Sequence, residues 1–149
     1  MSRREFSKVS SALWRSKRFL GLTSDRARLL LVYFITCSHQ NSAGAYSLPV
    51  GYALADLGWT AEEYRQHLDE LIEACLVAYD EETSEIFVTG WFKVCPPMNE
   101  KHASGTMTRV NEIESEQVRA VVIGEFKAAQ KVRLLLQGEA RRQRAEIEQ

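Results

Sequence analysis

The stretch at residues 44–91 constrains the fold most, because it places two helix-forming segments almost end to end. A short apolar helix is predicted after Pro49. It ends at Gly58, the residue type that most easily supplies the left-handed position beyond a helix C-terminus. Thr60 and Glu63 have the spacing of a capping box, so the next helix starts at a well-defined place. Two helices joined by so few residues must cross at a steep angle, which predicts a helix-turn-helix corner.

The segments on either side of this corner complete a recognisable order. A helix with an apolar stripe is predicted to begin at Thr23 or Ser24, and a short strand is predicted at residues 45–48. Strand-forming residues at 76–79 and 85–91 flank the polar turn DEETS, which predicts a hairpin. The order helix, strand, helix, helix and hairpin predicts a winged helix-turn-helix with a C-terminal helix. The expected fold class is mainly α with a small β wing.

The C-terminal third is expected to hold a connector and one last helix. Residues 92–105 contain Pro96 and Pro97 followed by polar residues, so we expect a surface connector rather than a helix or a central strand. The last helix is predicted to open at Glu114 or Ser115. Gly138 is expected to interrupt it, and the polar tail beyond is expected to fray unless a partner orders it.

The predicted organisation therefore has three parts: a basic N-terminal arm at 1–22, a winged-helix domain at 23–99, and the connector with the C-terminal helix at 100–149. The apolar positions of the last helix do not keep a clean heptad, so the segment 118–126 is expected to pack back on the domain. The part after Val132 has adjacent leucines and then basic residues. It is the better candidate for contact with a second subunit in a homodimer.

Charge is distributed unevenly along a chain whose net charge is only −1. Residues 1–20 carry six basic residues and one acidic residue, whereas residues 61–90 carry one basic and nine acidic residues. Basic side chains beside aromatic ones suit a polyanion, so the arm is a candidate phosphate-contacting segment. Alternatively, the arm docks its apolar side on the domain and exposes its charges to solvent; the two interpretations are compatible. The apolar residues that could share a loose helical face are Phe6, Val9, Leu13 and Trp14.

The helix from Thr60 to Ala74 is the recognition helix if the domain reads DNA. Its side chains Arg65 and Gln66 can pair bidentately with guanine and adenine edges. The carboxylates around them argue against base readout, because phosphates repel them. Two interpretations therefore stay open: base readout by this helix, and an acidic face that is solvated or meets a basic partner. The full set of predicted DNA-binding residues is Arg3, Arg4, Lys8, Arg15, Lys17, Arg18, Thr60, Arg65, Gln66, Lys93 and Lys101.

The sequence contains few signs of a catalytic site, a metal site or a cofactor site. The chain has no nucleophile elbow, no P-loop and no dinucleotide-binding glycine motif, so an enzyme is not expected, nor is any cofactor. Cys37 and His39 are close in sequence, but the other cysteines and histidines are scattered singly, which does not favour a metal site. Cys37 and Cys75 fall in apolar-periodic stretches and are expected to be buried thiols of a protein in a reducing cytoplasm. No signal peptide is evident, and no apolar run approaches the ~20 residues of a membrane span.

Several short motifs resemble those of the winged-helix domain of phage and prophage replication proteins, the replisome-organiser or DnaD-like kind. The resemblance covers roughly the middle half to two-thirds of the chain. The shared features are the Ser-Asp opening of the first helix, the G-x-Y-x-L strand, the D-L-G-W-T turn, the L-V-x-Y-D entry to the hairpin, and the closing W-F with P-P-M-N.

This resemblance implies DNA binding coupled to self-assembly at a replication origin. The chain ends soon afterwards without a clear second assembly or helicase-loading domain, so a small DNA-binding or accessory protein is expected. The preferred hypothesis is a non-catalytic, cytoplasmic DNA-binding protein acting in phage or prophage replication initiation or transcription control, with other replication proteins as possible partners. The alternative is a winged-helix interaction or assembly module that does not bind DNA directly.

Overall fold

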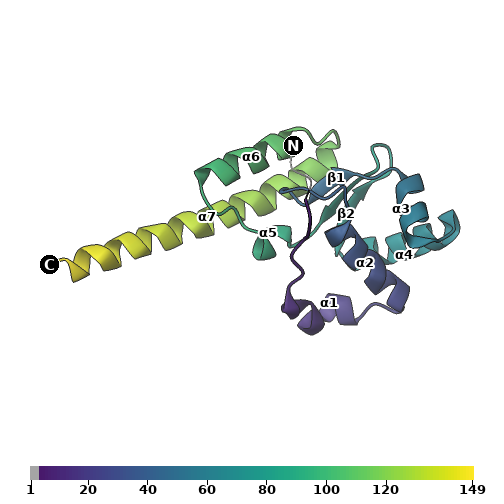
Figure 1. Ribbon diagram of the computed structural model, residues 1–149, viewed down its shortest axis with the longest axis horizontal. Coiled ribbons are helices and arrows are strands. Elements are labelled where there is room, and N and C mark those ends of the chain that lie inside the picture. Colours follow the sequence, from purple (N-terminus) through teal and green to yellow (C-terminus); the bar gives the residue numbers. More distant parts are fainter. Residues whose placement is uncertain (1–3) are drawn as a thin grey trace.

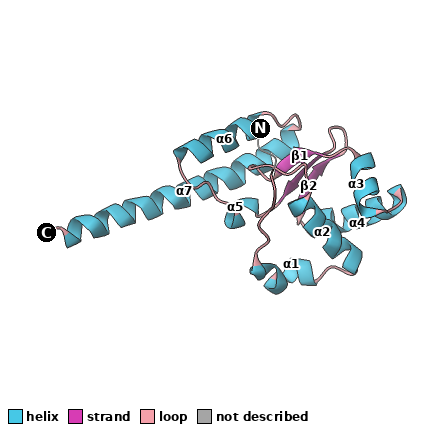
Figure 2. Ribbon diagram, in the orientation of Figure 1, coloured by secondary structure: helices cyan, strands magenta, loops and turns pink. Residues whose placement is uncertain are grey.

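Helices surround one small antiparallel sheet in the computed structural model of the protein, which describes residues 4–149 (Figure 1). The mainly helical class with a small sheet is therefore confirmed (Figure 2). The elements are a 3-10 turn η1 (Ser11–Arg15), α1 (Lys17–Leu20), α2 (Asp25–Thr36), β1 (Ala45–Ser47), α3 (Val50–Leu57), α4 (Ala61–Glu73), β2 (Val77–Asp80), β3 (Glu85–Val88), α5 (Trp91–Val94), α6 (Glu100–Asn111) and α7 (Glu116–Ile147).

The corner between α3 and α4 forms as the sequence predicts. Gly58 takes the left-handed conformation at φ 69°, and its backbone N–H is bonded to the Leu54 carbonyl. Thr60 accepts a hydrogen bond from the Glu63 N–H, and the Glu63 carboxylate accepts one from the Thr60 N–H, so both halves of the capping box are present. Ser24 caps α2. Local side-chain chemistry thus sets both ends of this turn.

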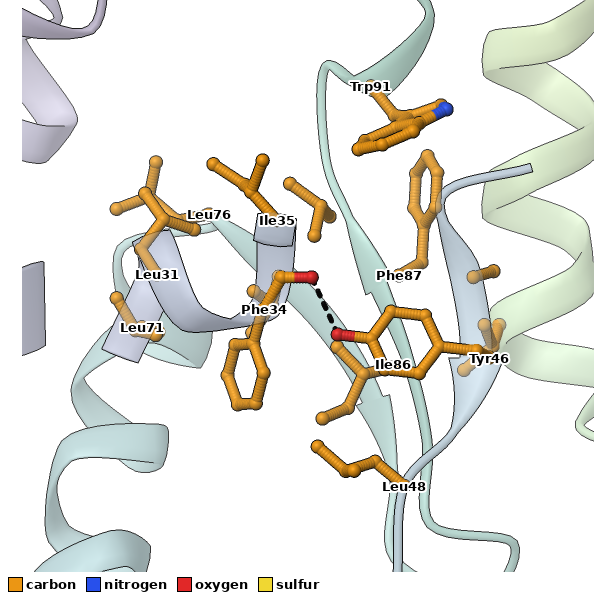
Figure 3. Packing of buried hydrophobic residues seen from close by; sticks show 14 of the residues in the cluster. Leu31, Phe34, Ile35, Tyr46, Leu48, Leu71, Leu76, Ile86, Phe87 and Trp91 are labelled. Carbon is orange, nitrogen blue, oxygen red and sulfur yellow. Dashed lines mark hydrogen bonds between the residues drawn. The ribbon is translucent and has the colours of Figure 1, made fainter. Parts of the chain in front are cut away.

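The sheet has the strand order β1-β3-β2, so β3 pairs antiparallel with both neighbours. All four residues of β3 are buried. Ile86 lies on the face toward α2, beside Tyr46, whose hydroxyl donates to the Phe34 carbonyl at 2.6 Å (Figure 3). Phe87 lies on the opposite face, where its ring is 6.3 Å from that of Phe92. Both faces of the sheet are therefore covered by protein.

Helix α7 covers the second face, and its N-terminus is fixed to the sheet. The buried carboxylate of Glu85 accepts the backbone N–H groups of Ser115 at 2.7 Å and Glu114 at 3.1 Å. The Ser115 hydroxyl lies 2.6 Å from the Asp80 carboxylate, and this hydrogen bond lowers the pKa of Asp80. Two carboxylates thus meet the positive end of the α7 dipole. Further along α7, the Phe126 ring packs edge-on against Phe92 at 5.5 Å.

Residues 92–105 are not an irregular connector, contrary to the sequence prediction. The strand ends at Val88 and α5 begins at Trp91, while the two prolines are confined to a short link. Asn99 caps α6, accepting from the His102 N–H at 2.8 Å. The buried positions of α6 are Ala103, Thr106 and Val110. Small and polar residues make this stripe, so it carries little hydrophobic signal.

Helix α7 runs from Glu116 to Ile147 without a break, so the expected interruption at Gly138 is wrong. Glycine in a helix costs about 1 kcal/mol relative to alanine but still donates its backbone hydrogen bond, so a single glycine need not end a helix. The part of α7 beyond Val132 extends away from the rest of the molecule (Figure 1).

Two expected burials are also wrong. Phe6 and Val9 are exposed because the chain before Ser11 is not helical, and Trp14 is exposed on η1; of the predicted face only Leu13 packs partly on the core. The arm docks mainly through Phe19 and Leu22. Cys75 is exposed, since it follows the end of α4 with a φ of 57°, which turns it away from the helix stripe. Cys37 is buried, as expected, and its thiol donates to the Tyr46 hydroxyl.

Among the described residues, no helix combines the length and the apolar character that crossing a lipid bilayer requires.

Gly44 should be the glycine least tolerant of substitution. Its φ is 70°, and a Cβ atom there would lie 2.3 Å from Cγ of Trp91. We expect Gly44→Ala to lower the free energy of unfolding by about 3 kcal/mol or more, through overpacking and a strained backbone. Gly105→Ala on α6 is the control, because its Cβ meets nothing within 4 Å; it should stabilise by about 0.5–1 kcal/mol. Urea unfolding of both variants measures the difference, and a Gly44→Ala protein as stable as wild type would contradict the packing.

Candidate nucleic-acid interface

Two of the predicted cations lie beside α5. The Arg4 guanidinium sits 5.5 Å from the centre of the Trp91 ring. Burial raises the pKa of the Cys95 thiol, and the nearby charges of Arg4 and Lys8 partly oppose the rise. The arm therefore brings two positive charges close to α5, which runs from Trp91 to Val94.

Two more cations lie beside α5 and line the same pocket. The Arg18 guanidinium donates to the Cys75 carbonyl at 3.0 Å, and Lys93 lies on α5 itself. Both are close to Glu125: burial raises the pKa of that carboxyl, while the Gly90 N–H, Lys93 and Arg18 act to lower it. The four residues around α5 form what we call the α5 cation cluster: Arg4, Lys8, Arg18 and Lys93.

The other predicted basic residues do not join this cluster by any close contact. Arg15 and Lys17 are exposed on η1 and α1, next to Trp14, whose surface is 63% exposed. Lys101 is exposed on α6. Arg3 lies outside the described residues. The arm thus contributes both to the cluster and to a more distant basic segment.

The predicted residues of α4 lie elsewhere. A 13-residue helix is about 20 Å long, so Thr60 is roughly that far from Cys75, where Arg18 binds. Thr60 uses its hydroxyl in the capping box, and Gln66 is exposed. Arg65 is paired with Asp69 at 3.0 Å and with Glu81 in the hairpin turn at 3.2 Å. The predicted site is therefore split into two regions.

The outer surface of α4 and the hairpin turn is acidic. Arg65 is its only predicted DNA-binding cation, and that charge is already matched by two carboxylates. The exposed acidic residues of α4 and the turn are Glu62, Asp69, Glu73, Glu81 and Glu82. Phosphates would be repelled by this surface.

Arg26 is a cation that the sequence interpretation did not consider. It lies on α2 but reaches the start of α4, where it pairs with Glu63 at 3.1 Å and sits 5.6 Å from the centre of the Trp59 ring. The sequence spacing could not predict this contact, because it joins α2 to the start of α4, two segments that are far apart in the chain.

Ser24, His67 and Glu70 bring a hydroxyl, an imidazole and a carboxylate together between α2 and α4. Ser24 Oγ lies 3.2 Å from His67 Nδ1, and Glu70 lies 3.7 Å from the same nitrogen. A catalytic triad needs the nucleophile and the orienting carboxylate at opposite ring nitrogens. Glu70 also accepts hydrogen bonds from the Thr23 N–H at 2.6 Å and hydroxyl at 2.7 Å, so the group ties the start of α2 to α4.

Within residues 4–149, no set of three or more histidine, cysteine, aspartate or glutamate side chains is arranged to hold a metal ion. His39, which neighbours Cys37 in the sequence, instead lies with its ring 4.9 Å from that of Tyr52.

A groove with a volume of about 780 Å³ runs along α7 next to the cation cluster. Its α7 wall is mostly aliphatic, and Phe92 and the two prolines also line the groove. Arg18 and Lys93 also line it. Sequence analysis missed this groove because its walls come from four segments far apart in the chain. The α7 residues that line it are Glu125, Ala128, Ala129, Val132, Arg133 and Leu136.

Comparison with known proteins adds no family: no family model matches the chain, and neither the curated proteins nor the solved structures include a significant match. The resemblance to phage replication proteins therefore stays a prediction.

Glu70 should stabilise the fold in a pH-dependent way. Burial acts to raise the pKa of Glu70, but hydrogen bonds from Thr23 and the nearby His67 outweigh it and lower the pKa from 4.5. A lowered pKa means that the charged form stabilises the folded state. That contribution is present above the unfolded-state value and disappears as the pH falls through the folded-state value.

We therefore expect Glu70→Gln to lose about 1–2 kcal/mol of unfolding free energy at pH 7. The loss should shrink as the pH falls below about 4. Urea unfolding at several pH values measures it, with the exposed Glu73→Gln as the control. A loss that is the same at pH 3 and pH 7 would show that the charge of Glu70 does not stabilise the fold.

Proposed function

We propose that α2, α3, α4 and the β2–β3 hairpin form a winged helix-turn-helix domain, with α4 in the recognition-helix position and the hairpin as the wing. The support is the order of the elements, the left-handed Gly58 between α3 and α4, and the sheet order β1-β3-β2. Helix α7 is an addition that covers the face of the sheet turned away from α2.

The function that the geometry supports best is non-catalytic DNA binding through backbone phosphates, in a cytoplasmic protein of phage or prophage type. The single observation that carries this proposal is the gathering of basic residues around α5: Arg4 lies on the Trp91 ring, Arg18 and Lys93 line the pocket beside Phe92, and Lys8 acts on Cys95. Such contacts give affinity without sequence specificity. The exposed Trp14 beside Arg15 adds an aromatic surface of the kind on which bases stack. Replication initiation and transcription control both suit this activity.

Base readout by α4 is a weaker part of the same proposal. Arg65 can reach a guanine edge only after leaving Asp69 and Glu81, and the carboxylates around it would be brought close to phosphates, which repel them. Thr60 and Gln66 approach a groove only if α4 docks despite this repulsion. We therefore place the main contact on the arm and α5.

A second candidate function follows from the same acidic surface. A winged helix whose α4 and hairpin turn carry carboxylates suits a basic partner protein, such as another replication protein, better than it suits DNA. We also propose that the protein is a homodimer that associates through α7, whose second half extends from the molecule with exposed leucines.

The phosphate proposal predicts a steep salt dependence. If four cations each neutralise one phosphate of random duplex DNA, the slope of log affinity against log salt should be about −3.6. Arg4→Ala/Lys8→Ala should reduce the slope to about −1.8. Lys127→Ala/Lys131→Ala removes the same charge from exposed positions on α7 and should leave the slope unchanged. Fluorescence anisotropy from low to moderate salt measures all three. Absence of binding at low salt would favour the protein-interaction function instead.

The position of DNA relative to α4 has its own test. Asp69→Asn/Glu81→Gln removes both carboxylates that hold Arg65. If DNA lies on the arm side, about one Debye length or more from these residues, affinity at 0.15 M salt should change by less than roughly twofold. A gain of tenfold or more would show that α4 faces DNA. Glu62→Gln/Glu73→Gln is the matched control, since it removes the same charge from α4 without releasing Arg65.

A further inference from the structure

The second half of α7 has a largely exposed stripe that is apolar except for Gln143. Leu136 is 60% exposed and Ile147 is 84% exposed. Spacings of four, four, three and four residues place the members of the stripe on one helix face. An isolated helix of this length is marginal in water unless its apolar face is covered. The members of the stripe are Val132, Leu136, Ala140, Gln143 and Ile147.

The groove described above ends where this stripe begins. Val132 and Leu136 belong to both, since they form the end of the groove wall and the start of the exposed stripe. The groove is lined mainly by apolar atoms, as a site for the apolar face of a helix requires. One molecule therefore carries a helical ridge and an apolar groove side by side.

A surface with a ridge and a groove side by side is self-complementary. If the ridge of one copy enters the groove of a second, a twofold axis places the second ridge in the first groove, and the contact closes as a dimer. Both surfaces carry charges of both signs. The groove is lined by Arg18, Lys93 and Glu125, and the half of α7 that enters it carries Glu139 and Glu146 as well as Arg142 and Arg144, so opposite charges are available on each side.

The two α7 helices must run antiparallel. The stripe continues the face of α7 that is buried against its own domain at Val118, Val122 and Phe126. A parallel partner on that face would bring its domain onto the first one. An antiparallel partner keeps the two domains at opposite ends and leads each exposed stripe toward the other domain.

We propose that two copies of this chain associate antiparallel through α7, with the C-terminal half of each α7 lying in the groove of the other between α7 and the Phe92–Pro97 segment. This assignment rests on the homodimer named in the proposed function and identifies its contact surface. Arg18 and Lys93 of the cation cluster line the groove, whereas Arg4 and Lys8 do not, so the Arg4 and Lys8 pair tests DNA binding separately from the dimer.

The test compares two leucines two residues apart. Leu136 lies on the stripe, and Leu134, which is 54% exposed, lies on the opposite side of α7. Leu136→Asp should weaken the dimer roughly 1000-fold, because a hot-spot loss of about 2 kcal/mol occurs twice in a symmetric contact. Leu134→Asp should leave the dissociation constant within about threefold of wild type. Sedimentation equilibrium measures both, and circular dichroism checks that both variants are folded.

A groove variant separates this arrangement from simple pairing of the two tails. Ala128 is exposed and lines the groove, but it is not part of the stripe. Ala128→Trp should therefore fill the groove and also weaken the dimer at least about 30-fold. A dimer unaffected by Ala128→Trp would overturn the groove assignment. A wild-type protein that stays monomeric at about 100 µM, or equal effects of Leu134→Asp and Leu136→Asp, would overturn the proposal as a whole.

The two proposals fail in different assays. Arg4→Ala/Lys8→Ala should remain dimeric while its DNA binding weakens, and Leu136→Asp should keep a salt-dependent affinity for DNA as a monomer. A dimer without any DNA binding would leave the contact in place and remove only the proposed function.

Discussion

Burial of β3 on both faces is the constraint on which the rest of the structure depends. A strand at the centre of a three-stranded sheet needs partners on two edges and on two faces, and here each is supplied by a different part of the chain. Ile86 requires the layer of α2, whereas Phe87 requires α5 and α7. Each of these side chains contributes about 1.5–3 kcal/mol when fully buried. Without α7, Phe87 and Phe92 would face water, so α7 is an integral part of the fold.

This arrangement changes what the hairpin can do. A hairpin with one free face can lie along DNA, but the β2–β3 hairpin has α7 on that face, with the α7 N-terminus bonded to Glu85. Only the edge and the turn stay open, and both carry carboxylates, with Glu81 bonded to Arg65 of α4. The position usually assigned to a wing therefore holds negative charge. Positive charge gathers near the opposite end of α4, where Arg18 meets the Cys75 carbonyl.

The sequence predicted the features that depend on neighbouring residues. Gly58, Thr60 and Glu63 act within one turn of chain, so the corner between α3 and α4 could be placed closely from spacing alone. Helix α6 could not, because its buried stripe contains Thr106 and Ala103 and its start follows two prolines. A stripe of small and polar residues becomes visible only once a neighbouring helix shows which face is covered.

Features that depend on distant residues escaped prediction for a different reason. The α5 cation cluster brings residues of the N-terminal arm together with residues about 90 positions later in the chain. The groove forms only where α7 lies beside Arg18 of the arm and beside α5. A count of charges along the chain showed a basic arm but could not show which surface the arm crosses. The predicted DNA-binding residues consequently fell into two regions, one around α5 and one on α4, and only coordinates distinguish them.

Glu125 links the position of α7 to the position of the α5 cation cluster. Its carboxylate, on α7, accepts the Gly90 N–H at 2.8 Å, immediately before α5 begins. The seating of α7 therefore fixes the position of α5, and with it Lys93 and the Trp91 ring on which Arg4 lies. Any occupant of the groove would contact this carboxylate or its surroundings, since Glu125 is part of the groove wall. Binding at α7 and the placement of the cations are thus coupled through one partly buried hydrogen bond, because a shift of α7 large enough to break it would move the cluster.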